Sequence, residues 1–233
     1  MHRDARFGIC VKKSREEPHC ATILVGNRRL LIWLLPLYNS STSLQAMKNR
    51  YTPEEYAAEL QRQTQQVASL AGALDDSALN WQPGPKSWSI GQCLDHLVVM
   101  NTAMVGAMRE AVSENLDQLE PRQKPIEAAS WLTRWYVDHT EPPPKMKLRA
   151  PGKIVPTSRV SGDVLARFEA AQQGILDFVR EFGSADLGDV RYKNAIVRGV
   201  HLSIDTGLAL MAVHNRRHLW QAEQVKSNAG FPR

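Results

Sequence analysis

Two histidines stand four residues apart near the end of the chain, His214 and His218, in the sequence AVHNRRHLWQAE. No helix breaker interrupts this stretch, so the spacing predicts a helix with both imidazoles on one face, where they can share a metal ion. A third histidine, His96, lies in another stretch of helical character more than a hundred residues earlier. Three neutral imidazoles that leave one coordination position open are the ligand set of a catalytic zinc-type site.

The residue directly after His214 argues against one familiar metal chemistry. A zincin peptidase needs a glutamate directly after the first histidine to act as the base, and here that residue is Asn215. Histidine pairs with this spacing also occur on helices that bind no metal. The pair alone is therefore a weak indication of a metal site.

Helix-start signals show which elements must position these histidines. The sequence TPEE at residues 52–55 is a capping box with proline at the first helical position, and it predicts a helix over about residues 53–74. The sequence SIGQ at residues 89–92 gives the same signal for a second helix, which continues through Met108 and carries His96.

Apolar periodicity predicts two more helices. The third covers residues 162–182 and is ended by Gly183, and the fourth covers about 203–228 and carries both paired histidines. A short link joins the first two helices, whereas a long crossover joins the second and third. This pattern predicts an all-α fold, a four-helix bundle of two helical hairpins. Bundles place metal sites between facing helices, so the third histidine can face the other two.

The crossover at residues 117–161 is rich in proline, which rules out a long helix there. An irregular segment of this length inside a domain usually serves as a lid or binding loop. Trp131, Trp135 and Tyr136 are therefore candidates for lining a substrate pocket. The alternative is that these aromatic side chains seal one edge of the core.

With 233 residues, the chain suits one domain and an appendage. We expect the helical domain over residues 47–228 and a short C-terminal tail over 229–233. Residues 1–46 show no sustained periodicity, and three interpretations stay open: a secretory signal, a disordered extension, or an over-extended translation start. We favour the last, because Met47 leads directly into the first capping box.

Charge and cysteine usage restrict the partners and the compartment. Seven Lys or Arg against three Asp or Glu give residues 1–46 a balance of +4, which leaves +1 of the total +5 for the rest. The low net charge of residues 47–233 argues against nucleic-acid binding. No apolar run is long enough to span a membrane. Cys10, Cys20 and Cys93 build no disulfide framework, which favours a cytoplasmic location. Trp88 can pack on Cys93, whose thiol is expected in the core.

The segment LNWQPGPKSWSIGQCLDHL at residues 79–97, followed distantly by HNRRHLWQ at 214–221, resembles the DinB-like superfamily. The resemblance covers about residues 51–228. It implies a four-helix bundle, often dimeric, whose metal is bound by one histidine of the second helix and two of the fourth. By position these ligands are His96, His214 and His218. Imidazole ligands suit zinc or nickel, and iron or copper also stay open.

Characterised relatives include transferases that attach low-molecular-weight thiols such as bacillithiol or mycothiol to electrophiles, and a mycothiol-dependent isomerase. The resemblance therefore implies a metal-dependent thiol S-transferase, or a hydrolase, that acts on a small electrophilic molecule and can be a homodimer. Gln221 lies near His218 by helical face and is the candidate to hold its second ring nitrogen. The alternative is a helical module that binds metal or dimerises without turnover, since no general base stands out.

Overall fold

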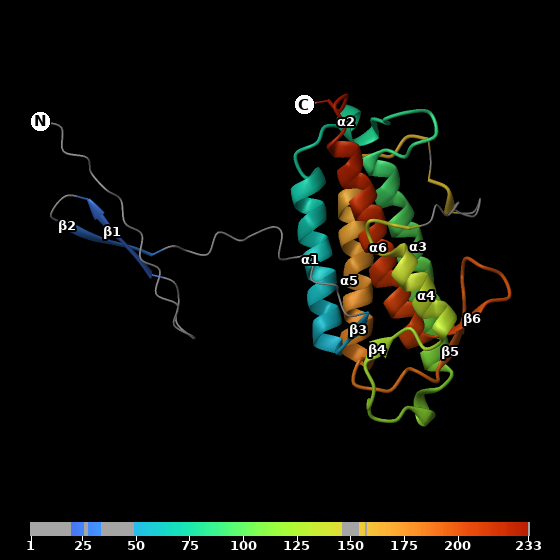
Figure 1. Ribbon diagram of the computed structural model, residues 1–233. Helices are drawn as coiled ribbons and strands as arrows, with labels where there is room; N and C mark the ends of the chain where they lie inside the picture. The colour runs from blue at the N-terminus through green and yellow to red at the C-terminus, as the bar shows by residue number, and fades with distance from the viewer. Residues whose placement is uncertain (1–19, 26–27, 34–48, 146–153, 157, 233) are drawn as a thin grey trace, which may run out of the picture. The chain divides into compact units, whose positions relative to one another are not determined.

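Two compact units make up the chain, Met1–Met47 and Lys48–Arg233. A computed structural model describes residues 20–25, 28–33, 49–145, 154–156 and 158–232 (Figure 1). In the first unit, β1 (Cys20–Val25) pairs antiparallel with β2 (Arg28–Trp33). This hairpin was not predicted, although its two aliphatic runs flank Gly26-Asn27, a dipeptide typical of two-residue hairpin loops. The interpretations of residues 1–46 otherwise concern residues outside the described ones.

The second unit is mostly helical, as predicted. Its helices are α1 (Pro53–Ala71), α2 (Asp76–Asn80), α3 (Ile90–Ser113), the 3-10 helix η1 (Leu116–Gln118), α4 (Trp131–Thr140), α5 (Val164–Phe182) and α6 (Ile204–Lys226). Two short antiparallel pairs accompany them, β3 (Arg50–Tyr51) with β4 (Ile126–Glu127) and β5 (Arg191–Lys193) with β6 (His201–Ser203). These short strands were not predicted.

Both predicted capping boxes are confirmed. At the start of α1, the backbone N–H of Glu55 donates to Thr52 Oγ1 at 3.2 Å, and the N–H of Thr52 donates to Glu55 Oε2 at 2.9 Å. At the start of α3, Ser89 and Gln92 exchange the same two bonds at 3.1 and 3.0 Å. Such reciprocal bonds satisfy the free N–H groups of the first turn, which fixes where each helix begins.

Helix ends agree less closely with the sequence prediction. Helix α1 ends at Ala71 rather than near residue 74, because Asp75 caps the short α2 by accepting from the N–H of Ala78 at 2.8 Å. Helix α3 extends five residues beyond Met108. Beyond α6, Phe231 of the expected tail is 9% exposed and packs edge-to-face on Trp81, so this tail takes part in the core.

Four long helices lie side by side (Figure 1): α1 packs against α5 and α6, and α3 packs against the same two. Helices α3 and α5 run parallel, because ion pairs join their two starts, Asp95 with Arg167, and their two ends, Arg109 with Glu181. Helices α1 and α6 also run parallel, since Tyr56 donates to the carbonyl of Leu208 and Gln63 donates to that of Ala212.

The predicted pairing into two hairpins is therefore wrong. Consecutive long helices would contact each other in a hairpin, but α1 takes its main helix contacts from α5 and α6. The physical reason lies in the crossover. Because α5 runs parallel to α3, the end of α3 and the start of α5 lie at opposite ends of the two helices. The long connection between them permits this arrangement, in which α5 packs against both α1 and α3.

A buried polar layer separates the two larger apolar clusters of the core. Tyr56, Leu60, Met108, Phe178 and Leu208 belong to the cluster at the α1 start, and Leu94, Leu97, Phe168 and Leu219 belong to the one at the α3 start. One amide from each long helix separates them: Gln63, Asn101, Gln172 and Asn215, each at most 2% exposed. Asn215 donates to the side chains of Gln63 and Gln172 at 2.9 and 3.2 Å. Its side chain therefore has a structural position away from the histidines.

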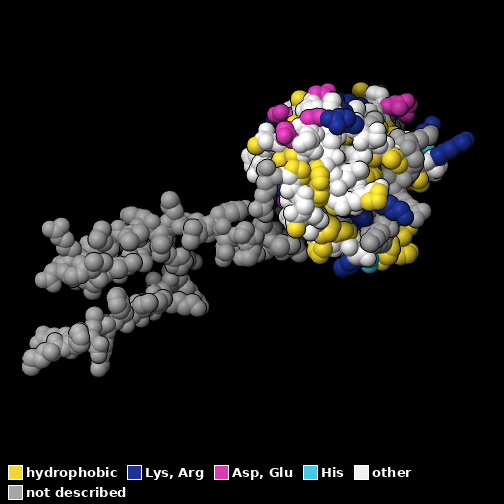
Figure 2. Space-filling model, turned by 90° about the horizontal axis from the view of Figure 1, so that it is seen from above, with side chains coloured by type: hydrophobic (Ala, Val, Ile, Leu, Met, Phe, Trp, Pro, Cys, Tyr) yellow, Lys and Arg dark blue, Asp and Glu magenta, His cyan; other side chains and the backbone are white. Residues whose placement is uncertain are grey.

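The surface of the helical unit carries both signs of charge. On the face shown in Figure 2, Lys and Arg side chains and Asp and Glu side chains both occur. Within the described residues, every helix is too short or too polar to cross a lipid bilayer.

Candidate metal centre

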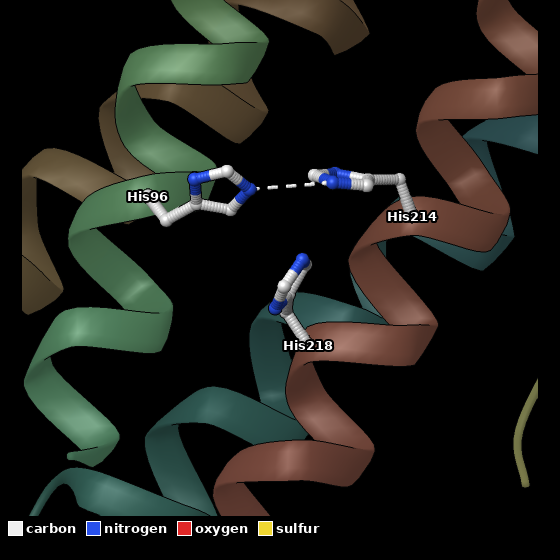
Figure 3. A group of neighbouring side chains, drawn as sticks. All are labelled: His96, His214 and His218. Carbon is white, nitrogen blue, oxygen red and sulfur yellow. Dashed lines mark hydrogen bonds between the residues drawn. The ribbon is translucent and has the colours of Figure 1, made fainter. Parts of the chain in front are cut away.

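The three histidines singled out in the sequence lie together between α3 and α6 (Figure 3). The Nε2 atoms of His96 and His214 are 3.3 Å apart, and one ring nitrogen from each of the three histidines lies within 4.8 Å of the others. The ring centroids are 4.6 to 5.1 Å apart. This spacing brings three nitrogen donors around one point, which is what a divalent ion requires.

Two local features place these rings. His96 lies in the second turn of α3, whose start is fixed by the Ser89 capping box. His214 and His218 lie one turn apart near the middle of α6. Side chains four residues apart in a helix share a face, and that face of α6 turns toward α3.

Hydrogen bonds at the far side of two rings leave their Nε2 atoms facing the cluster. His96 Nδ1 donates to the carbonyl oxygen of Ile154 at 2.8 Å, and His218 Nδ1 donates to Gln221 Oε1 at 3.0 Å. A neutral imidazole with a protonated Nδ1 has its lone pair on Nε2. Metal-ligating histidines are held in this way by an acceptor at the other nitrogen, so the donor set fits a divalent ion.

Burial keeps the three imidazoles neutral. His96 and His218 are 2% and 8% exposed, and His214 is half-buried. Desolvation lowers the pKa of His96 and, together with repulsion from His96 and Arg217, lowers the pKa of His214 to about 3. Burial, with repulsion from the other two histidines and Arg217, holds the pKa of His218 well below its ordinary value. Neutral imidazole is the form that binds metal, so the cluster is ready to bind at neutral pH.

The predicted aromatic lining lies on α4, which packs on α6 through Val137. Trp131 is 79% exposed, and Trp135 is exposed and stacks on His139 with ring centroids 4.3 Å apart. Tyr136 is half-buried and close enough to Arg217 for the two to interact electrostatically. Among these three aromatic residues, Tyr136 is therefore linked to the histidine cluster through its interaction with Arg217. A substrate-binding role for all three stays a prediction.

Two neighbours of the cluster were not identified from the sequence. Ile154 contributes a backbone carbonyl, which leaves no trace in the type of its side chain. The indole of Trp88 lies against both His96 and His218, with centroids 5.0 and 5.5 Å away. Trp88 directly precedes the capping box of the helix that carries His96, and this position could have indicated a contact with the histidines. The contact predicted from the sequence was with Cys93. That thiol is fully buried, as predicted, and burial raises its pKa.

A half-buried arginine between the paired histidines, Arg216, was also missed. The Arg216 guanidinium binds Glu141 through two bonds of 2.6 and 2.7 Å, Glu59 at 2.9 Å and the Tyr51 hydroxyl at 2.9 Å. Glu141 is the C-terminal cap of α4 and Glu59 lies on α1. Arg216 thus fixes the middle of α6 relative to α1 and α4. The charged Glu59 directly before the core residue Leu60 was the sequence signal for such a partner.

The mostly helical fold and the three imidazoles that converge between α3 and α6 define the class, a helical protein with a candidate metal centre. The family model described as the DinB superfamily matches residues 59–222, and the chain belongs to this superfamily. The matched range includes all three histidines, so the resemblance seen in the sequence is confirmed. None of the curated proteins and none of the solved structures compared with the chain matches it.

Proposed function

We propose that this protein is a metal-dependent enzyme that joins a small thiol to a small electrophile, with hydrolysis as the other reaction open to the same site. The single observation that carries the proposal is the convergence of three neutral imidazoles. We also propose that α1, α3, α5 and α6 form the four-helix bundle of the superfamily. A cytoplasmic location and a homodimer belong to the same proposal.

His96, His214 and His218 would hold the ion, and zinc or nickel suits three imidazole ligands. Bound there, the ion would supply a positive charge that lowers the pKa of a thiol or water reaching its open coordination position. Neutral ligands matter for this role, because they leave the positive charge of the ion uncompensated. The Ile154 carbonyl and Gln221 contribute by keeping two of the rings in the required tautomer.

The charge around the histidines favours an anionic reactant such as a thiolate. Arg217 is half-buried on α6, between His214 and His218 in sequence, and its positive charge acts on both rings. The nearest acid in sequence to His96, Asp95, is engaged by Arg167 at 2.8 Å. An incoming anion near His214 and His218 would therefore meet the positive charge of Arg217, which lowers the free energy of its bound state.

A second candidate function is a helical module that binds metal without turnover. The engagement of Asp95 by Arg167 favours it, because this carboxylate is then held away from the role of general base. Exposed Trp131 and Trp135 on α4 would in that case serve contacts with another protein or a second copy.

Metal content combined with a thiol-conjugation assay tests the proposal. We expect about one zinc or nickel ion per chain, lost in His218→Ala together with conjugation of a small thiol to an electrophilic test compound. His201→Ala is the matched control, because His201 is exposed on β6 and is not part of the cluster. Metal without conjugation for any thiol tested would favour the non-catalytic module. Protein purified without chelator that contains no metal, and takes up none, would contradict both functions.

A further inference from the structure

The indole of Trp88 lies against two of the three candidate ligands. It is nearly parallel to the His218 ring, with an interplanar angle of 22° and centroids 5.5 Å apart. It is tilted by 52° relative to the His96 ring, with centroids 5.0 Å apart. One aromatic side chain thus contacts a ligand on α3 and a ligand on α6 at the same time.

The backbone before α3 holds this indole in place. Ser89 is the extended N-cap of α3, so Trp88 leaves the line of the helix. Gln82 Nε2 donates both to the carbonyl of Ser87 and to Gln92 Oε1, each at 2.8 Å, which ties the preceding loop to the first turn of α3. Trp88 also packs against the apolar cluster that contains Cys93. Contacts other than those with the histidines therefore help to hold the indole in place.

We propose that Trp88 is a positioning residue of the metal centre, whose indole holds the rings of His96 and His218 in the orientation that turns their Nε2 atoms toward His214. This inference rests on the proposed metal centre. It assigns to Trp88 a role beyond packing, namely to raise metal affinity by fixing the ligands before the ion arrives.

Ring rotation explains why such support is needed. The torsion that turns an imidazole about its Cβ–Cγ bond is broad, so a single hydrogen bond restrains it weakly. The acceptor for His218 is the side chain of Gln221, which is itself half-buried and has several rotatable bonds. A flat indole stacked on the ring restricts this rotation further. Ligands fixed in advance lose less conformational entropy when the ion binds, and the complex is more stable as a result.

Zinc affinity of the full chain, measured by competition with a chromophoric chelator, tests the proposal. Loss of a group that orients metal ligands typically weakens affinity by roughly 10- to 100-fold, so we expect Trp88→Ala to bind zinc about tenfold more weakly. Trp88→Phe keeps an aromatic face and should stay within about threefold of the wild type. Trp81→Ala is the matched control, because Trp81 is also half-buried and packs on the same apolar cluster but contacts Phe231.

A second measurement covers the case in which Trp88→Ala does not fold. Cobalt added to the wild type should quench part of the tryptophan fluorescence, and that part should be missing in Trp88→Phe. Zinc affinity in Trp88→Ala equal to that of the wild type, or the same cobalt quench in Trp88→Phe, would overturn the role of Trp88. A wild type that binds neither ion would instead contradict the metal centre itself, so the two failures are distinguishable.

Discussion

His218 Nδ1 donates to Gln221 Oε1 across 3.0 Å, one turn further along the same helix. The bond leaves the Nε2 lone pair of His218 for the shared point between α3 and α6. Because donor and acceptor both lie on α6, the orientation of this ligand is encoded within four consecutive residues.

Gln221→Ala should weaken zinc binding by roughly tenfold without abolishing it, because His218 remains but can adopt the other tautomer. Chelator competition measures the change. Gln224 is exposed on the same helix, so Gln224→Ala controls for changes in helix propensity. Equal zinc affinities in the two variants would show that the Gln221 bond does not orient a ligand.

The metal-free protein should lose stability as the pH falls below about 6.5. The pKa of His214 is about 3 in the folded protein, below the value of about 6.5 for an unfolded chain. Between these pH values the unfolded state binds more protons than the folded state. The contribution of His214 to the free energy of unfolding therefore has its full value above about pH 6.5 and decreases as the pH falls toward 3. Urea unfolding at several pH values measures this slope.

His214→Gln is the comparison for the pH experiment, because it removes one buried titrating group and leaves the carboxylates in place. The variant should show a shallower decrease, by at most about 1.4 kcal/mol per pH unit for a single group. Parallel pH profiles for the two proteins would mean that His214 titrates normally in the folded chain.

Arg217→Met should change two affinities in opposite directions. Removing a positive charge beside His214 and His218 lowers the repulsion felt by a divalent ion, so zinc should bind roughly two- to fivefold more tightly. A small thiol should bind the metal-loaded protein more weakly, because its thiolate loses a favourable charge. Chelator competition measures the first affinity and the absorption bands of the cobalt-loaded protein measure the second.

Arg217→Lys serves as the control for this charge, since it keeps the positive charge and should preserve both affinities within a few-fold. If Arg217→Met weakened zinc and thiol binding together, Arg217 would act through packing rather than through its charge.

Arg216→Met should destabilise the fold by about 3 kcal/mol, because it removes one charged partner from the carboxylate of Glu59, which is 1% exposed. Urea unfolding measures the loss. The exposed pair of Arg180 with Asp177 provides the control, and Arg180→Met should cost less than about 0.5 kcal/mol. A similar small cost at Arg216 would show that Arg62, which also pairs with Glu59, is a sufficient substitute.

Local signals predicted the helices well and their arrangement poorly. The starts of α1 and α3 follow from Thr52 and Ser89, because a capping box involves only four neighbouring residues. The pairing of α1 with α5 and α6 depends instead on contacts between helices that are far apart in the sequence. Such contacts are determined by tertiary packing, which hydrophobic periodicity does not report.

In the candidate site, too, local features were predicted and contacts between distant residues were mostly missed. The spacing of His214 and His218 is a property of one helix, and His96 was predicted to face them from another. The Ile154 carbonyl could not be predicted, because every residue carries one. Glu59 and Gln63 place polar groups on the inner face of α1, so a positively charged partner for Glu59 could have been expected. The sequence alone does not show which distant arginine or lysine forms that ion pair.

The three imidazoles come from segments 118 residues apart in the chain, although they meet within one cluster. An ion held there would act as a reversible cross-link between α3 and α6, closing a long loop of the unfolded polypeptide. Because only the folded chain presents this binding site, the fraction of unfolded protein would depend on the free metal concentration in its surroundings. The supply of metal would then determine how long each molecule survives proteolysis, as well as whether it can react.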